Sequence, residues 1–414
     1  MDARNAVVVP EAKLFREGLP LHTHEQRVAL ARRRFFEDGE GLAGVVPSAV
    51  LQSWDRCVRA GVHPHSRPEP EYASASELRL MMERNRTLLE FAQPELDQLD
   101  LILAGTPCKA MLVDPDGTIL HASPPQHRHG ELLNKGTRAG STLREQLAGT
   151  TAPMLSAVTG CSTTVLYGEH FYDMLLHLHC AAAPLRDQHG QVLAVLDVSV
   201  DGQPFSFDAS TVVRLAATAI ENRLLVAQGD PCLVVRFHIQ PSLLNTAYEG
   251  MLGVNERGVI AWINDAGAQL LRLKQSAGSG LMVEEVLGMT LHGLLGRVGH
   301  GSPGITLAPG GMRLWLDVQC APIGHNKPPL PMVAASADPP DRGASKPLVL
   351  GEPLTGKEVR VLRLLADGHS DMAIADKLCV SIHTVRSHLR NLYFKLDAHS
   401  RMQAVLAARR AGII

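Results

Sequence analysis

The segment from Pro353 to Ile414 constrains the fold more than any other part of the chain, because helix-start and helix-stop signals divide it into short helices. Thr355 stands three residues before Glu358, the spacing of a capping box in which each side chain accepts a hydrogen bond from the other residue's backbone amide. Apolar residues then recur at helical spacing until Gly368, which ends the first helix. Ser381 is placed to cap the third helix. The pattern predicts an all-α four-helix unit over residues 353–414.

The third predicted helix, 383–396, separates two kinds of residue on its faces. One stripe is apolar and can pack on the other helices: Val385, Leu389, Leu392 and Leu396. A second face lies near the amino-terminal half, where a recognition helix meets base edges, and arginine there can bond bidentately to guanine. The expected base-reading residues are Arg386, Ser387 and Arg390. The expected phosphate contacts, which position the helix without reading sequence, are Thr384, Asn391 and Lys395.

The charge of this segment differs from that of the rest of the chain. Residues 353–414 hold ten Lys and Arg against five Asp and Glu, a local net charge of +5, whereas the whole chain carries −2 and the remainder therefore −7. A basic terminal unit on a mildly acidic body is typical of a DNA-binding domain attached to a sensory one. A helical bundle whose basic face is merely solvated is the alternative.

The same segment resembles the LuxR type of helix-turn-helix. The resemblance rests on Leu354-Thr355, Glu358, Ile374-Ala375 with Leu378, Thr384-Val385-Arg386 with His388, Lys395-Leu396 and Gly412-Ile413. It implies that double-stranded DNA is a partner. The chain departs from the family pattern at Ser370-Asp371-Met372-Ala373, where members commonly carry a start that contains asparagine and lysine.

The body before this segment divides into a helical stretch and a strand-rich one. Residues 1–104 are expected to be largely helical, with periodicity from about 77 to 103 interrupted at Pro94. Arg32-Arg33-Arg34 is expected to be a solvated run in a polar amino-terminal stretch. Residues 105–228 alternate strands with turns and end in an amphipathic helix, which predicts an antiparallel sheet of α+β type.

A second, smaller α+β unit is expected over residues 241–336. Met251–Val254 and Val259–Trp262 flank a turn and predict a hairpin, and a helix at 264–273 and a strand at 313–321 follow. Residues 337–352 hold three prolines and predict a linker. The chain is therefore expected to be multidomain.

Most of the body resembles the sensory half of the acetoin-catabolism type of bacterial enhancer-binding activators. The resemblance rests on Ser53-Trp54-Asp55-Arg56-Cys57, Gly149-Thr150 with Ala152, Gly168-Glu169-His170-Phe171, Cys180 to Leu185 and Gly190 to Ser199. It implies a GAF domain over 105–228. The unit after it resembles a PAS domain through Gly258-Val259-Ile260 and Asn264-Asp265-Ala266.

The chain departs from these activators in lacking a phosphate-binding loop. No G-x-x-x-x-G-K-[ST] motif occurs in the sequence, so the central ATPase of that family is not expected. Thr151 replaces the asparagine of the family's G-T-N-A helix, and Thr142–Glu145 lacks the tryptophan usual in the GAF loop. Ordinary promoter regulation is expected in place of remodelling of the alternative-sigma polymerase.

A GAF-like sheet with a helical lid usually encloses a small pocket, and the residues expected to line it are His170, Phe171, His177, His179 and Cys180. On a strand, His177 and His179 would point to the same face, which leaves a divalent metal open beside a small organic effector. No carboxylate or thiolate stands at known zinc spacing, so no cofactor is expected. A domain that only dimerises is a third possibility. Other histidines are expected in a solvated, Pro-rich loop: His121, His127 and His129.

Seven cysteines, an odd number at wide spacing, indicate reduced thiols in a cytoplasm rather than a disulfide framework. Cys180 and Cys379 are expected to be packed, although a redox-sensing thiol at Cys180 stays open. Asp114 is expected to begin a turn rather than to accept a phosphoryl group. Residues 1–20 do not resemble a signal peptide, and no apolar run predicts a membrane span.

Together these patterns predict a cytoplasmic, DNA-binding transcription regulator rather than an enzyme. Its expected partners are a small-molecule effector, RNA polymerase and a second copy of the chain, because paired half-sites supply affinity that one small DNA-binding domain lacks. Residues 209–227 and 400–410 are candidate dimer helices. Two other functions stay open: a signalling scaffold whose basic terminal unit binds protein, and a small hydrolase that uses Cys180 and His170.

Overall fold

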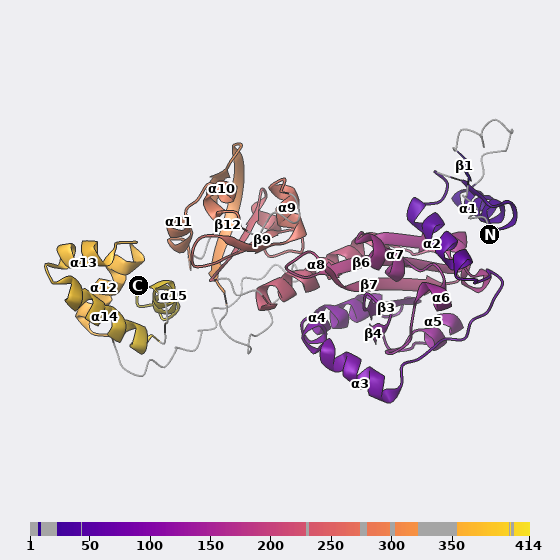
Figure 1. Cartoon of the computed structure of the whole chain (residues 1–414), viewed down its shortest axis with the longest axis horizontal. Helices are drawn as coiled ribbons and strands as arrows, with labels where there is room; N and C mark the ends of the chain where they lie inside the picture. The colour runs from indigo at the N-terminus through magenta and orange to yellow at the C-terminus, as the bar shows by residue number, and fades with distance from the viewer. Residues whose placement is uncertain are drawn as a thin grey trace. The chain divides into compact units, whose positions relative to one another are not determined.

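The computed structural model describes residues 7–9, 23–42, 44–228, 232–273, 280–298, 303–321, 354–396, 398 and 401–414 (Figure 1). Two units make up the chain, Met1–Leu224 and Leu225–Ile414. The linker expected at 337–352 lies outside the described residues.

The first unit is built on a five-stranded antiparallel sheet in the order β4-β3-β7-β6-β5. Its strands are β3 (Cys108–Val113), β4 (Ile119–Ala122), β5 (Thr163–Leu166), β6 (Leu178–Arg186) and β7 (Val192–Asp201). In the centre, β7 pairs with β3 and β6, so that Met111 and Ala182 lie opposite Asp197. β3 is buried along its whole length because helices cover both faces of the sheet. The antiparallel α+β arrangement predicted by the strand pattern is confirmed.

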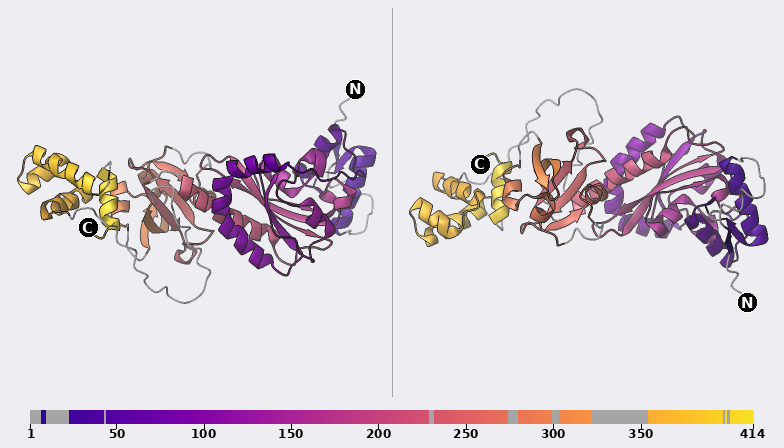
Figure 2. Two further views of the ribbon diagram at one scale, coloured as in Figure 1. Left: turned by 90° about the horizontal axis from the view of Figure 1, so that it is seen from below. Right: turned by 90° about the horizontal axis from the view of Figure 1, so that it is seen from above.

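Two long helices, α4 (Arg86–Leu103) and α8 (Ala209–Gln228), cover one face of this sheet (Figures 1 and 2). A buried ion pair joins them, with 2.8 Å between Arg223 Nε and Glu95 Oε2. Pro94 lies inside α4 and does not interrupt it, contrary to the expectation from sequence. Buried residues on both sides of the proline hold the helix on the sheet: Leu88, Ala92, Leu96 and Leu99.

The opposite face is covered by elements from both sides of position 105. They are α1 (His24–Arg33), the π-helical turn η2 (Arg34–Asp38), α2 (Ser48–Arg59) and α7 (Ala152–Thr159). Val28, Trp54 and Phe171 belong to the same buried cluster as Cys180 on β6. The expected boundary between 1–104 and 105–228 therefore does not separate two folding units, because the N-terminal helices complete the core over the sheet.

The remaining elements of the first unit are short. They are β1 (Val7–Val9), β2 (Glu40–Leu42), α3 (Ala75–Arg84), α5 (Glu131–Gly136), α6 (Glu145–Ala148), η3 (Tyr167–Glu169) and η4 (Asp173–Leu175). β1 and β2 pair in parallel.

The second unit contains another five-stranded antiparallel sheet, in the order β10-β9-β8-β12-β11. Its elements are β8 (Leu233–His238), η5 (Pro241–Leu243), β9 (Gly250–Val254), β10 (Ile260–Ile263), α9 (Asp265–Leu270), α10 (Val283–Leu287), α11 (Leu291–Leu295), β11 (Gly304–Ala308) and β12 (Met312–Cys320). The predicted hairpin corresponds to β9 and β10, and the predicted strand at 313–321 to β12. The expected start at 241 is too late, because β8 pairs with both β9 and β12 in the middle of the sheet.

Four helices form the C-terminal part of the second unit, as the sequence predicts. They are α12 (Gly356–Ala366), α13 (Asp371–Leu378), α14 (Ile382–Lys395) and α15 (Arg401–Arg410). Each contributes buried residues to one core: Val361, Ile374, Leu389 and Ala404 are examples.

No helix in the part of the chain that the structure describes has both the length and the hydrophobicity that crossing a bilayer requires.

Candidate DNA-binding helix and sensory site

Local capping positions the helices of the C-terminal part. Thr355 Oγ1 accepts from the amide of Glu358 at 3.3 Å, and the Glu358 carboxylate accepts from the amide of Thr355 at 2.8 Å, which confirms the capping box. Ser381 caps α14 by accepting from the amide of Thr384 at 3.1 Å. Cys379, expected in the core, is instead exposed and left-handed with φ 51°, because it forms the turn that ends α13.

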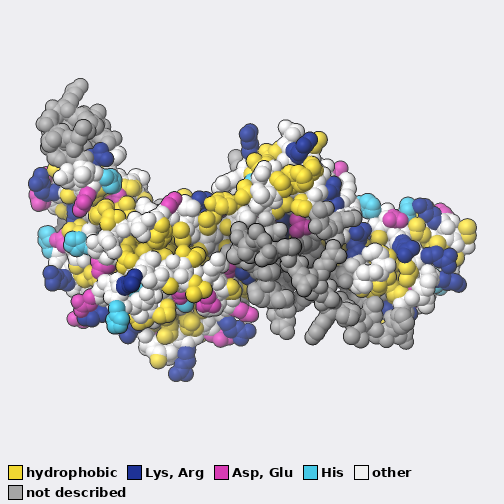
Figure 3. Space-filling view, turned by 180° about the vertical axis from the view of Figure 1, so that it is seen from behind, with side chains coloured by type: hydrophobic (Ala, Val, Ile, Leu, Met, Phe, Trp, Pro, Cys, Tyr) yellow, Lys and Arg dark blue, Asp and Glu magenta, His cyan; other side chains and the backbone are white. Residues whose placement is uncertain are grey.

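The faces of α14 divide as the sequence predicts. Val385 and Leu392 are fully buried and Leu389 nearly so, whereas Arg386 and Arg390, one turn apart, are exposed. Ser387 beside them is half-buried. Figure 3 shows Lys and Arg side chains gathered on the C-terminal part, at the right of the view. The helix thus presents two guanidinium groups to solvent from a fixed apolar base, the arrangement that groove reading needs.

The three expected phosphate contacts are not placed alike. Asn391 is exposed, and Thr384 is half-buried with its hydroxyl 2.8 Å from the Ser381 hydroxyl. Lys395 does not share the exposed face: its ammonium donates at 3.2 Å to the carboxylate of Glu358, and the two side chains are 15% and 4% exposed. Lys395 therefore joins the end of α14 to the start of α12, because the capping glutamate is buried beside it.

Asp371, in the departure from the family pattern, touches two arginines. Its carboxylate lies 3.9 Å from Arg386 Nε and 3.6 Å from Arg401 Nη1. Arg386 stays 69% exposed. Asp371 can hold the Arg386 side chain toward the start of α13 until a stronger partner, such as a guanine edge, competes for it.

In the body, the structure brings together three of the five residues expected to line an effector site. His170 and Phe171 are fully buried, and His170 Nε2 lies 3.4 Å from the Sγ of Cys180. Burial lowers the pKa of His170 to about 4 and raises the pKa of the Cys180 thiol well above its ordinary value. Both shifts disfavour the thiolate–imidazolium pair that a nucleophilic cysteine needs, so this pair gives no support to a hydrolase.

The other two expected residues, His177 and His179, are not a matched pair. β6 begins at Leu178, so His177 lies before the strand and is exposed, whereas His179 is buried with its ring 4.1 Å from that of Tyr167. Residues 173–175 form the 3-10 helix η4, and a turn at 176–177 separates it from the strand. Among the residues described, no three His, Cys, Asp or Glu side chains are arranged to hold a metal ion.

Two of the three histidines predicted in a solvated loop depart from that prediction. His121 lies on strand β4 with its side chain 23% exposed, and its Nε2 is 4.0 Å from Asp100 Oδ2. His129 is buried, and its Nε2 lies 3.0 Å from the carbonyl of Cys108, although His127 is exposed as expected. Asp114 forms the predicted turn, since its carboxylate accepts from the amide of Thr118 at 2.7 Å.

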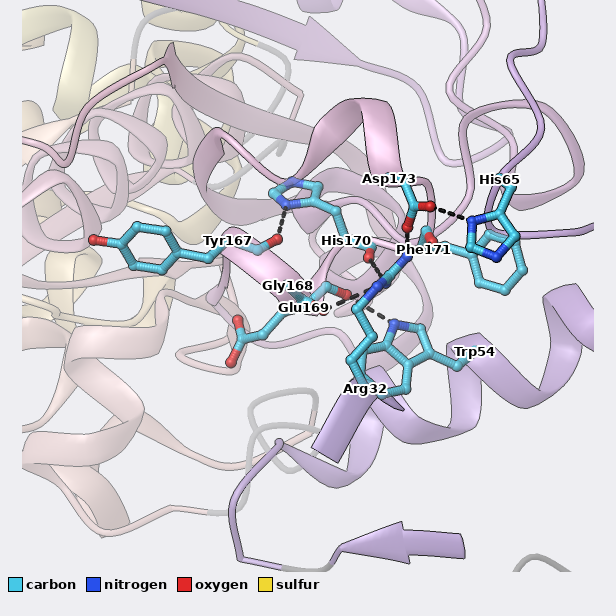
Figure 4. Close-up of polar contacts among 9 residues, drawn as sticks. All are labelled: Arg32, Trp54, His65, Tyr167, Gly168, Glu169, His170, Phe171 and Asp173. Carbon is cyan, nitrogen blue, oxygen red and sulfur yellow. Dashed lines mark hydrogen bonds and ion pairs between the residues drawn. The ribbon is translucent and has the colours of Figure 1, made fainter. Parts of the chain in front are cut away.

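The run Arg32-Arg33-Arg34 contains a residue of the site that the sequence analysis missed. Arg32 is buried and donates to the carbonyls of His170 and Phe171, each at 2.5 Å, and to the carboxylate of Asp173 at 2.7 Å (Figure 4). Helix α1 is thereby fixed on the loop that carries His170 and Phe171. Ala31 and Val28 on the same helix are buried, an apolar pattern that was a sequence signal for a packed helix there.

The segment 53–57 contacts two of the other segments that resemble the family, 149–152 and 168–171, and it also contacts Glu145. Trp54 Nε1 donates to the carbonyl of Glu169 at 2.9 Å (Figure 4), and Arg56 pairs with the carboxylate of Glu145 at 2.6 Å. Ser53 donates to Glu145 at 2.6 Å and lies 2.7 Å from the hydroxyl of Thr150. Residues of three separate segments that resemble one family therefore meet over one face of the sheet.

The pKa values of two carboxyl groups on this loop shift in opposite directions. Burial raises the pKa of Glu169 to about 7. Burial alone would raise the pKa of Asp173 as well, but hydrogen bonds from Arg32 and His65 outweigh it and lower that pKa (Figure 4). The carboxylate of Asp173 therefore stays ionised beside the guanidinium of Arg32, with His65 as its other hydrogen-bond partner.

Comparison with known proteins agrees with the geometry of the C-terminal part. Residues 352–408 match the family described as bacterial regulatory proteins, luxR family. A stretch of 61 residues is 41% identical to the HTH-type transcriptional activator RamA of Corynebacterium glutamicum, and covers 15% of this chain and 22% of that protein. The LuxR resemblance is confirmed.

Longer matches include the body. The chain is 27% identical over 287 residues to the acetoin catabolism regulatory protein of Cupriavidus necator, covering 68% of this chain and 39% of that protein. It is 24% identical over 250 residues to the glycerol metabolism operon regulatory protein of Citrobacter freundii, covering 59% of this chain and 38% of that protein. The resemblance of the body to the acetoin-catabolism type is confirmed, and the chain spans about two fifths of the length of these relatives.

Proposed function

We propose that this chain regulates transcription by binding double-stranded DNA through α14. Arg386, Ser387 and Arg390 would read bases, and Thr384 and Asn391 would contact phosphate; Lys395 is left out because it pairs with Glu358. The observation that carries the proposal is the division of α14 into a buried apolar stripe and an exposed pair of arginines, within a segment that matches the luxR family.

We further propose that the body is a sensor, with a GAF-like domain in the first unit and a PAS-like one around the second sheet. The support is the buried polar site at His170 and Cys180, together with relatives whose names refer to acetoin and glycerol metabolism. An effector that binds two conformations of the body unequally would shift their populations and alter DNA binding.

The expected partners follow from this proposal. A regulator of this kind acts on RNA polymerase in the cytoplasm and binds paired half-sites as a homodimer. Of the two candidate dimer helices, α8 buries most of its second half inside the chain, including Ile220, Glu221 and Leu224. The first half of α8, where Arg214 is exposed, is the part that could contact a second copy of the chain.

The test is binding of the purified full chain to genomic DNA fragments, read by sequencing, with and without small molecules from a cell extract. A palindromic site should be enriched, and the enrichment should be lost in Arg386→Ala/Arg390→Ala but kept in Arg84→Ala, which removes an exposed charge from the body. A shift with the small-molecule fraction supports sensing. No enrichment in any condition contradicts the proposal, and weak salt dependence of the binding favours a protein-binding scaffold.

A further inference from the structure

Seven side chains of the first unit have a buried atom with no hydrogen-bond partner among the described residues, and three such atoms lie on or beside α7 and on the sheet that it covers. These atoms are Asp197 Oδ1, Ser156 Oγ and Thr151 Oγ1. Asp197 and Ser156 are fully buried and Thr151 is 8% exposed. Buried polar groups are nearly always paired, because an unpaired one costs stability. Three in one place indicate a ligand that supplies the missing partners.

The three groups face the same layer between α7 and the sheet. Val195, two residues before Asp197 on β7 and therefore on the same face, shares a buried cluster with Ala152 and Leu155 of α7. Ser156 lies one helical turn after Ala152, and Thr151 is the residue that precedes α7. The residue opposite Asp197 on β6 is Ala182, and the residue opposite it on β3 is Met111.

This layer is continuous with the residues already assigned to the sensory site. Ser199 donates to Asp197 Oδ2 at 2.7 Å, and Ser199 lies opposite Cys180 in the sheet register. Cys180 in turn contacts His170 on the loop that Arg32 holds. A shift of the Asp197 side chain on ligand binding would therefore be passed to the loop through Ser199 and Cys180.

The charges nearby select the kind of ligand. The ammonium of Lys109, opposite Ser199 on β3, already donates to the carbonyls of Leu133 and Thr137. Arg32 is likewise occupied by carbonyls and Asp173. An anionic ligand would thus meet the Asp197 carboxyl group without a cation to balance it, whereas a purely apolar ligand would leave all three groups unpaired. Hydroxyl groups, which both donate and accept, satisfy a carboxyl oxygen and two hydroxyls.

We propose that Asp197, Ser156 and Thr151 form the polar wall of a binding site for a small uncharged molecule that carries hydroxyl groups, such as a short polyol or hydroxyketone. This inference rests on the proposed sensory function and names the ligand class and the residues of that site.

The first experiment measures the binding of single probes to the full chain by calorimetry and by thermal unfolding. The probes are glycerol, 1,3-dihydroxyacetone and acetoin at millimolar concentration, with pyruvate as an anionic and ethanolamine as a cationic comparison. We expect at least one neutral probe to bind saturably and raise the unfolding temperature, and the charged compounds to bind at least tenfold more weakly. Binding of none of the three neutral probes, or tighter binding of pyruvate or ethanolamine, would overturn the proposal.

Variants separate a binding site from a structural defect. Ser156→Ala and Asp197→Asn each alter a group with an unpaired atom, so without probe both should unfold at the wild-type temperature or above it. Both should weaken probe binding at least tenfold. The matched control is Ser123→Ala, which removes a buried hydroxyl that donates to Asp100 and accepts from the amide of Ala110, and should lower the unfolding temperature but leave probe affinity unchanged. If Ser156→Ala is destabilised like the control and still binds the probe, the hydroxyl has a water partner and the site is wrong.

DNA binding is measured on the same preparations. Retained sequence-specific DNA binding with no probe binding would overturn the ligand site and leave the regulator proposal standing. Probe binding without any sequence-specific DNA binding would support the ligand site and contradict the regulator proposal.

Discussion

Arg32 and Asp173 are 141 residues apart in the sequence, and their side chains meet at 2.7 Å between Nη2 and Oδ1. The same guanidinium donates to the carbonyls of His170 and Phe171. A helix near the start of the chain therefore fixes the loop that carries two residues of the sensory site. Because the guanidinium is buried, its partners cannot be replaced by water when one of them is lost.

Arg32→Met should lower the free energy of unfolding of the first unit by about 3 kcal/mol, since it leaves two carbonyls and a carboxylate without their buried donor. The measurement is urea unfolding of the full chain. Arg33→Met is the matched control. The Arg33 side chain is exposed, so its loss should lower the free energy of unfolding by less than about 0.5 kcal/mol. Equal losses in the two variants would mean that the contacts of Arg32 contribute little.

The contrast between Arg32 and the C-terminal helices shows what the sequence could predict. The caps at Thr355 and Ser381 and the stripe through Val385 and Leu389 are local patterns, and each is found in the structure where it was predicted. Arg32 stands in a run of three arginines that predicts solvation, and its partners lie far along the chain. Local periodicity carries no information about such contacts.

The candidate site in the body was predicted only in part. His170, Phe171 and Cys180 are brought together, but the pairing of His177 with His179 required β6 to begin earlier than it does. Asp197 was not singled out, although a lone carboxyl group inside the apolar strand 192–200 was a signal that the sequence offered. Its significance depends on which atoms are left unpaired, and that follows only from packing.

Arg386→Ala should weaken binding to the enriched DNA site by about 1–3 kcal/mol and relax specificity at one position. Stability should hardly change, because the side chain is 69% exposed and Asp371 keeps its contact with Arg401. The checks are a binding titration on the site and its single-base variants, and thermal unfolding. Unchanged affinity for every variant site would remove Arg386 from the reading face.

Lys395→Met should act on stability rather than on DNA contact. The substitution keeps the length of the side chain but leaves the buried carboxylate of Glu358 without its ammonium partner, which should cost about 1–3 kcal/mol. DNA affinity of the folded protein, measured well below the unfolding temperature, should change less than about threefold. A wild-type unfolding temperature together with a reduced salt dependence of binding would instead restore the phosphate contact that the sequence suggested.

Thiol reactivity should follow burial. Cys161 and Cys379 are exposed and should react with iodoacetamide in the folded protein, whereas Cys180 and Cys57 should react only on unfolding. Burial raises the pKa of Cys57 to about 12 and that of Cys180 well above its ordinary value, so few thiolates are present at neutral pH. Mass spectrometry of labelled peptides over time is the measurement. Labelling of Cys180 as fast as Cys161 would favour a redox-sensing thiol.

The carboxyl group of Asp197 should make stability depend on pH. Burial raises its pKa from 3.8 to about 7, so the folded state holds the proton more tightly than the unfolded chain does. The stability that this protonated group contributes is fully present below about pH 4 and is lost as the pH rises through about 7.

Asp197→Asn lacks this titration. The difference in free energy of unfolding, variant minus wild type, should therefore rise by on the order of 2 kcal/mol from pH 5 to pH 8. Glu169, with a pKa of about 7, titrates in the same range, but Glu169 and His170 are present in both proteins, so their contributions cancel in the difference. Urea unfolding of the two proteins at both pH values gives that difference. A difference that stays constant with pH would show that Asp197 keeps an ordinary pKa, and hence that its carboxyl group reaches water or a cation.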